Sequence, residues 1–275
     1  MRRFAAGVLA FIGLLLVPLA DAGVWTQREL LNTASFTGLA VDVLHRAEVS
    51  NVLAQRLTEE IEQRTSVPPE AQPVLASAVQ TAVATPEFEQ VFRSAVGAMH
   101  EQFANGDDRL ALDFNAALPV IRSMVAGVDP ALAAEIPDFA LPVIDVVTKD
   151  DAPALWDAVD VARRASLAFP IAALLVLGAA VALSTRRPVM LIVIGVGMLA
   201  IAIVLVLLIQ LGRGALSDVA GPQLSKDAFA AGYDVVSRSF AAQTAVFGAL
   251  GGASAALGVV LVWNTRRNWR SGEWA

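Results

Sequence analysis

The sequence predicts a mainly α protein: a multi-pass helical membrane bundle with a mostly helical extracytoplasmic domain, to which one short β-hairpin can be added. Four long apolar runs, 56% hydrophobic residues and a mean hydropathy of +0.60 make the chain too apolar for an ordinary soluble domain. Between the first two runs lies a long polar stretch, from Asp21 to Ser166, which is large enough to bury a core of its own.

Paired arginines set the predicted orientation. Arg2 and Arg3 precede the first apolar run, and Arg186 and Arg187 separate the second run from the third. Further arginines, the first of them Arg266, follow the fourth run. Because cytoplasmic loops carry the excess of Lys and Arg, we expect both termini inside and the large domain outside a plasma membrane.

The predicted domain organisation follows from these runs, since a bilayer core needs about 20 apolar helical residues. It comprises a signal anchor (1–22), an extracytoplasmic helical domain (23–166), span 2 (167–184), a cytoplasmic turn (185–188), span 3 (189–211), an extracytoplasmic loop (212–240), span 4 (241–263) and a cytoplasmic tail (264–275). The first run has two interpretations. It is short and ends in Ala20-Asp21-Ala22, which resembles a signal-peptidase site, but Trp25 is a typical interfacial anchor. We favour retention as a signal anchor.

Charge and cysteine content exclude several classes of function. From Asp21 to Arg164 the chain carries 22 acidic and 10 basic residues, a net charge of −12, which disfavours nucleic acid as a partner. The absence of cysteine excludes thiol catalysis, iron–sulfur clusters and Cys-based zinc sites.

Hydrophobic periodicity predicts helices in the outer domain over residues 51–64, with Ser50 as N-cap, and over residues 70–83. Thr85-Pro86-Glu87 combines a capping hydroxyl, a proline and an acid, which predicts the start of a third helix. That helix should end at Asn105-Gly106, because glycine commonly terminates helices.

Past Gly106 the spacing of the apolar residues changes from the helical period to every second residue. Alternation over residues 110–114 predicts a short strand, and the apolar residues 141–147 are its candidate partner. From Ala152 the pattern predicts a helix that continues without a break into span 2. A further helix is expected over residues 227–239.

Within the spans, Gly248 and Gly252 form a GxxxG pair, continued by Ala256. Small residues at this spacing allow close helix approach. We favour packing within one bundle over the alternative, a homo-oligomer. The three longer spans carry no ionisable residue deep inside, which argues against a transporter or proton relay.

No recognisable constellation for catalysis or metal binding emerges. His45 has Asp42 and Glu48 on the same helical face, but a solvated polar face is the simpler interpretation. His100 is expected to bond a nearby backbone group or carboxylate. The acids at 107, 108 and 113 lack the spacing of an EF-hand, and a solvated turn is expected. We therefore assign no catalytic, cofactor-binding or metal-binding residue.

Several short motifs occur together in this chain. They are Trp25 after the first run, Leu30-Leu31-Asn32-Thr33 with Phe36, Val49 to Ala54, Leu57-Thr58, Phe88 and Phe92 with His100, and the alternating residues 110–114. With these the chain resembles a family of uncharacterised actinobacterial four-span integral membrane proteins. The family often has Asp-Thr at Asn32-Thr33 and tryptophan at Phe92. The resemblance implies a helical extracytoplasmic domain between the first two spans, and it brings no activity or functional residues.

The expected function is that of a non-enzymatic envelope protein whose outer domain binds a partner protein or small ligand, with the bundle as anchor in the lipid bilayer. The alternative is a subunit of a transporter or channel with the outer domain as gate. A hydrolase acting on envelope polymers is a third hypothesis, which would need His100, Asp113 and nearby acids to converge in an outer cleft.

Overall fold

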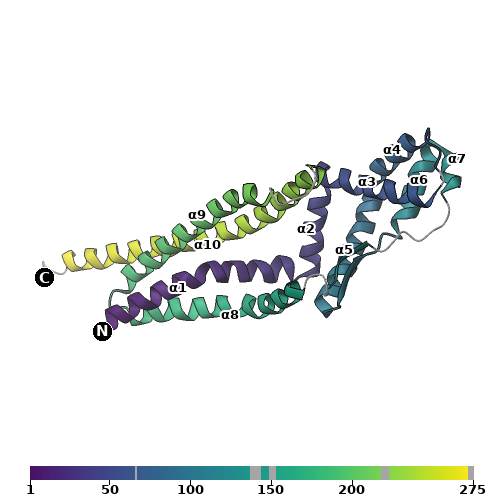
Figure 1. Ribbon diagram of the computed structural model, residues 1–275. Coiled ribbons are helices and arrows are strands. Elements are labelled where there is room, and N and C mark those ends of the chain that lie inside the picture. Colours follow the sequence, from purple (N-terminus) through teal and green to yellow (C-terminus); the bar gives the residue numbers. More distant parts are fainter. Residues whose placement is uncertain (66, 137–143, 149–152, 218–222, 272–275) are drawn as a thin grey trace. The chain divides into compact units, whose positions relative to one another are not determined.

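The structure, a computed structural model, describes residues 1–65, 67–136, 144–148, 153–217 and 223–271. The chain forms two compact units, which we call the bundle unit (residues 1–28, 160–212 and 237–275) and the helical unit (residues 29–159 and 213–236). Almost every described element is a helix (Figure 1), so the predicted mainly α class is confirmed.

The described part of the bundle unit is built from long helices. They are α1 (Arg2–Trp25), α8 (Pro153–Leu183), α9 (Arg187–Ser217) and α10 (Gln223–Ser271). Each contains a stretch long and apolar enough to cross a membrane. Leucines such as Leu174 and Leu211 are 74% and 73% exposed, a surface that is unfavourable in water and suited to lipid.

Two helices are longer than the spans they contain. The predicted absence of a helix break before Phe169-Pro170 is confirmed, because α8 runs unbroken from Pro153 through Pro170 to Leu183. The helix expected over residues 227–239 is not a separate element, since it is the first part of α10 and leads directly into the last span. Inside the bundle unit α8 packs on α1, where Gly13 accommodates the side chain of Leu177.

The arginine clusters gather at one end of the bundle unit. Arg3 Nε donates a hydrogen bond of 3.2 Å to Thr185 Oγ1, next to Arg186. On α10, Gly258 lies against the carbonyl oxygen of Pro188, so the arginines that follow it continue beyond this same end. The positive-inside rule requires the arginine clusters to lie on one side of a membrane, and their position at one end of the bundle unit is consistent with that.

Glycine allows α9 and α10 to approach closely. A Cβ atom at Gly251 would lie 2.8 Å from the carbonyl oxygen of Gly195 and 2.7 Å from Met198 Cβ. Gly248 also faces this interface, against Ala202. Gly252 does not, because a Cβ there would have no described atom within 4 Å. The contact inside the bundle therefore uses Gly248 and Gly251, and the predicted pair is split between two faces of α10.

The helical unit has a separate hydrophobic core. The core is centred on Phe88, Phe114 and Ile121, all at most 1% exposed, and the two phenylalanine rings stack at 6.5 Å. Its elements are a π-helical turn η1 (Thr26–Leu30), which joins it to α1, then α2 (Thr33–Leu44), α3 (Ala47–Arg64), α4 (Gln72–Val83), α5 (Pro86–Asn105), α6 (Ala117–Val128) and α7 (Pro130–Glu135).

Helix ends agree with the capping signals in all but one case. Thr85 Oγ1 accepts a hydrogen bond from Phe88 N at the start of α5, and Gly106 ends that helix with φ +80°, as predicted. Ser50 is not an N-cap. Helix α3 begins one turn earlier, after Arg46, and the Ser50 hydroxyl donates to the Ala47 carbonyl instead.

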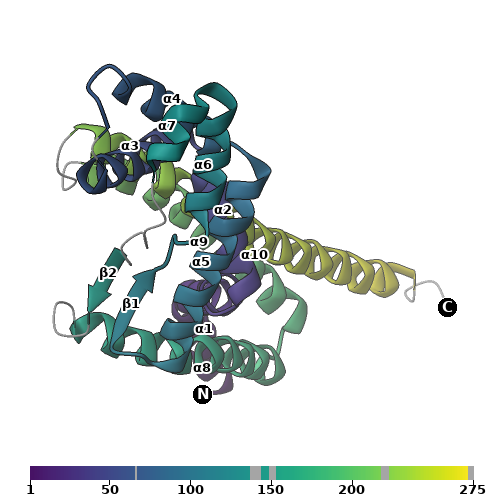
Figure 2. The same cartoon turned by 90° about the vertical axis from the view of Figure 1, so that its right-hand side faces the viewer.

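The predicted strand pair is also present. Strand β1 (Arg109–Leu112) pairs antiparallel with β2 (Ile144–Thr148), with Leu110 opposite Val147 (Figure 2). The first residues of the predicted partner strand, 141–143, lie outside the described residues. Phe114 follows β1 and is buried in the core rather than extending the strand.

Candidate functional site

An aspartate is buried inside the bundle unit. Asp21, in the last turn of α1, is 1% exposed, and its Oδ2 accepts a hydrogen bond of 2.6 Å from Thr244 Oγ1. Gln243 Nε2 lies 2.9 Å from the Asp21 carbonyl oxygen and 3.4 Å from Oδ1. Thr244 and Gln243 are themselves buried and belong to α10. The contact therefore joins the first candidate span to the last.

Further polar contacts hold the same end of α1. Trp25 Nε1 donates to Ser239 Oγ at 3.2 Å. On the other side, Ser166 of α8 is 2% exposed and donates to Gln27 Oε1 at 3.1 Å. Tryptophan prefers the membrane interface, and Asp21 lies one helical turn, about 6 Å, before Trp25. Asp21 is thus an ionisable group just inside a candidate span, which is the usual mark of a functional position in a membrane helix.

Sequence reasoning missed this cluster. In the sequence Asp21 forms part of a cleavage-like motif, and the three longer apolar runs carry no ionisable residue deep inside. An acid one turn before Trp25, together with the polar pair Gln243-Thr244 inside an apolar run, was the available signal.

His100 links α5 to the chain that leaves the bundle. Its Nε2 lies 2.8 Å from the Leu30 carbonyl oxygen and its Nδ1 lies 2.9 Å from Thr33 Oγ1. A carbonyl only accepts, so Nε2 carries the proton, and in the neutral ring Nδ1 accepts from the threonine. The ring also packs on Phe36 at 4.7 Å. His100 is 2% exposed and bonds a backbone group, as predicted.

Helix α2 begins with a side-chain cap. Asn32 is the N-cap of α2, and its Oδ1 accepts from Ser35 N at 3.0 Å. An aspartate can make the same bond. Asn32 therefore starts α2 in the same way as an aspartate at this position would.

The other candidate ligands do not form a metal centre. His45 is exposed, and its Nε2 lies 3.1 Å from Glu89 Oε2, not against Asp42 or Glu48. Arg93 donates to the other oxygen of Glu89 at 2.8 Å, and this bond, followed by the one to His45, lowers the pKa of Glu89. Among the described residues, no three His, Asp or Glu side chains are grouped to hold a metal ion.

The acids after Gly106 lie in the turns on either side of β1. Asp113 Oδ1 accepts from Asn115 N at 2.8 Å, which stabilises the turn after β1. Asp107 and Asp108 are exposed at the preceding turn. His100 and Asp113, which the hydrolase hypothesis required together, each bond to their own surroundings.

Two grooves flank α4 in the helical unit. The first, which we call the apolar groove, separates α4 from α6, has a volume of about 500 Å³ and is bordered by Val74, Met124 and the 67% exposed Val128. The second, the polar groove, separates α4 from α3, has a volume of about 390 Å³ and is bordered by Glu59 and Glu62 among other polar residues. Helix α4 thus borders both grooves, and the acids of the polar groove belong to α3.

Comparisons with protein-family models, with curated proteins and with solved structures found no match to this chain. Membership of the four-span family that the sequence resembles therefore stays a prediction.

Proposed function

We propose that the chain is a non-enzymatic integral membrane protein of the cell envelope whose helical unit lies outside the membrane and binds a partner. The two grooves that flank α4 carry this proposal. A protein segment with an apolar side chain next to a basic one matches them, because the apolar groove would desolvate the first and Glu62 in the polar groove would attract the second. The other acid of that groove, Glu59, already pairs with Arg56 at 3.2 Å.

Two further observations support the proposal. The helical unit has its own buried core, so it can hold a binding surface independently of the bundle. The gathering of arginines at one end of the bundle unit favours that end as the cytoplasmic one. Along the chain, the first segment of the helical unit begins after the last turn of α1 and ends in the first turns of α8, away from the arginines, so the unit would then lie outside.

Site-specific photo-crosslinking in intact cells tests the proposal. A photoreactive amino acid replaces Ser77, which borders the apolar groove, and in a matched protein it replaces Ser94, which is exposed on α5 outside both grooves. We expect a discrete protein adduct from position 77 and none from position 94. Adding Val128→Asp should abolish the adduct without unfolding the unit, since Val128 is exposed. Equal labelling at both positions would contradict the proposal.

The buried Asp21 favours one alternative, a transporter or channel subunit with the helical unit as gate, because ionisable residues within spans often line transport pathways. Proteoliposomes that contain the purified chain test it. Ion flux that Asp21→Asn abolishes and that Asp42→Asn, on exposed α2, leaves intact would favour transport. Wild-type protein that passes no ion above the empty-liposome rate would favour the binding protein.

A further inference from the structure

We propose that the bundle unit binds an anionic phospholipid in a groove between α1 and α9, with the phosphate at Arg3 and Arg186 and an acyl chain along the apolar walls. The inference concerns the arginine end of the bundle and does not depend on what the helical unit binds. We call this space the arginine groove.

The arginine groove is open and deep enough for part of a lipid. Its volume is about 500 Å³, within the range of small-molecule pockets. Gly7 of α1 leaves it open, since a Cβ there would have no atom within 4 Å. Farther along the bundle the two helices close on each other, because Leu14 packs directly on Gly197. The groove therefore starts at the end of the helices and is blind at the other end.

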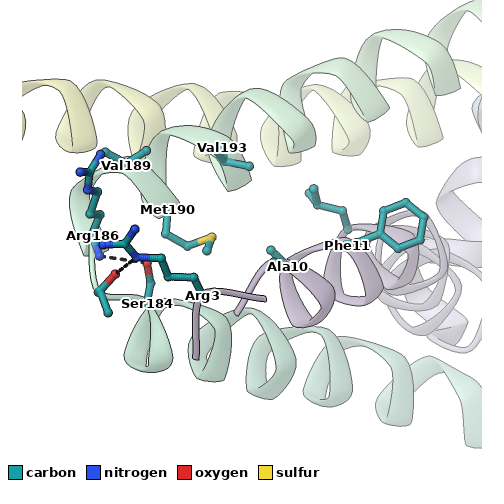
Figure 3. Close-up of a pocket in the computed structure, with 11 residues that line it drawn as sticks. Arg3, Ala10, Phe11, Ser184, Arg186, Val189, Met190 and Val193 are labelled. Carbon is teal, nitrogen blue, oxygen red and sulfur yellow. Dashed lines mark hydrogen bonds between the residues drawn. The ribbon is translucent and has the colours of Figure 1, made fainter. Parts of the chain in front are cut away.

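The chemistry of the walls changes along the groove. Arg3, Ser184 and Arg186 lie together at the open end, and Ala10, Phe11 and Val193 lie farther in (Figure 3). Phe11 and Val193 are 64% and 50% exposed, so apolar surface is left for a ligand to cover. A ligand that fits both regions has an anionic head and a hydrocarbon tail.

The two arginines are positioned for a phosphate. Thr185 Oγ1 accepts from Arg3 Nε at 3.2 Å, which fixes the guanidinium beside the turn, and its two terminal amino groups remain to donate. No carboxylate of the described chain forms an ion pair with Arg3 or Arg186. Guanidinium groups bind phosphate with paired hydrogen bonds, and basic pockets between spans at a membrane surface select anionic headgroups.

Native mass spectrometry of the delipidated full chain tests the inference. The detergent-solubilised protein is titrated with phosphatidylglycerol and, separately, with zwitterionic phosphatidylcholine of the same acyl chains. We expect one phosphatidylglycerol to bind with preference over phosphatidylcholine. In Arg3→Gln/Arg186→Gln, affinity for phosphatidylglycerol should fall about 30-fold, from the loss of two juxtamembrane charges.

The matched control is Arg2→Gln/Arg187→Gln, which removes the same charge from the two neighbouring positions, both exposed and outside the groove lining. This control should retain most of the affinity. An equal loss in both double variants would mean diffuse attraction to the surface and would overturn the site. Equal binding of the two lipids would overturn it as well, and so would a dimer of the chain that excludes lipid.

A second variant fills the groove without touching the charges. Gly7→Phe places a ring in the open space of the groove, and Gly178→Phe places one in open space on α8, away from the groove. We expect Gly7→Phe to weaken phosphatidylglycerol binding at least tenfold and Gly178→Phe to leave it unchanged. Undiminished binding to a folded Gly7→Phe protein would show that the acyl chain does not occupy the groove.

Discussion

Thr244 Oγ1 lies 2.6 Å from Asp21 Oδ2, and this hydrogen bond joins the first and last candidate spans. The two residues are 223 positions apart in the chain, and both are at most 1% exposed. A buried carboxylate oxygen without a donor is unfavourable, so the bond orients α10 on α1 as well as stabilising the pair.

Replacing Thr244 by valine removes the donor and keeps the shape of the side chain. We expect Thr244→Val to destabilise the bundle by about 1–2 kcal/mol, because Asp21 Oδ2 loses its hydroxyl partner in a site closed to water. Thr265→Val is the control, since the Thr265 hydroxyl is exposed and bonds only to its own helix. Unfolding of the detergent-solubilised proteins measures the stability of both variants relative to wild type. A Thr244→Val protein as stable as the control would mean that the contact contributes nothing.

Adjacent glycines of α10 should respond in opposite directions to alanine. Gly251→Ala would place a methyl group 2.8 Å from the Gly195 carbonyl oxygen, so α9 and α10 must separate, at a cost of about 1–3 kcal/mol. Gly252→Ala meets open space and should be neutral or stabilising by up to about 1 kcal/mol, because alanine favours helix more than glycine does. Thermal unfolding of the two variants side by side measures the difference. Equal effects would contradict the packing of α10 on α9.

Local signals in the sequence were sufficient for the elements they control. The start of α5 at Thr85 and its end at Gly106 were predicted because a cap depends on residues within one turn. The predicted start of α3 at Ser50 was wrong, because the cap signal there was local but the helix begins earlier. The chain enters at Arg46 in an extended conformation, so three residues before Ser50 become helical, and a side chain that resembles a cap cannot reveal this.

The buried cluster could not be predicted from local pattern. Asp21 resembles a cleavage-site residue until its partners at 243 and 244 are placed beside it, and nothing near Asp21 encodes a contact at that separation. The prediction that Gly248 and Gly252 share one contact face was wrong for Gly252, also because it depends on a distant part of the chain. GxxxG spacing identifies small residues, but Gly251 and Gly252 point about 100° apart around a helix, and only the position of α9 determines which one is covered.

We expect the difference in stability between wild type and Glu89→Gln to depend on pH. Its pKa lies below the ordinary value of 4.5, mainly because Arg93 donates to it and secondly because His45 does. Because the pKa of Glu89 is lower in the folded chain than in the unfolded one, the ionised carboxylate adds to the free energy of unfolding. This added stability is fully present above pH 4.5 and is lost as the pH falls through the pKa of the folded chain. We expect Glu89→Gln to be slightly less stable than wild type at pH 7 and equal to it in stronger acid.

Thermal midpoints of both proteins across pH 2–7 measure this effect, with Glu87→Gln on the same helix as the control for loss of one negative charge. The difference should be small and should shrink in high salt, because the pair is at the surface. A Glu89→Gln difference that grows as pH falls would have the wrong sign and would contradict the assignment.

Retention of the first span is testable by mass. Helix α1 continues through Ala22 to Trp25, and cleavage at Ala22 would remove Asp21 and with it the contact to α10. We therefore expect protein expressed from this 275-residue sequence and extracted from membranes to keep α1 and the mass of the uncleaved chain, 28.9 kDa. A smaller product that begins at Gly23 would show that the first run is a cleaved signal peptide.

Single cysteines give an unambiguous test of orientation, because the chain has none of its own. Asn105→Cys places a thiol at the exposed end of α5, and Asn264→Cys places one at the exposed arginine end of α10. Both replace an exposed polar side chain, at the last residue of α5 and within α10, so neither should disturb packing. In intact cells a membrane-impermeant maleimide should label position 105 and spare position 264 until the membrane is permeabilised. The opposite pattern would place the helical unit in the cytoplasm, because along the chain that unit begins after the end of α1 that is farther from Arg3.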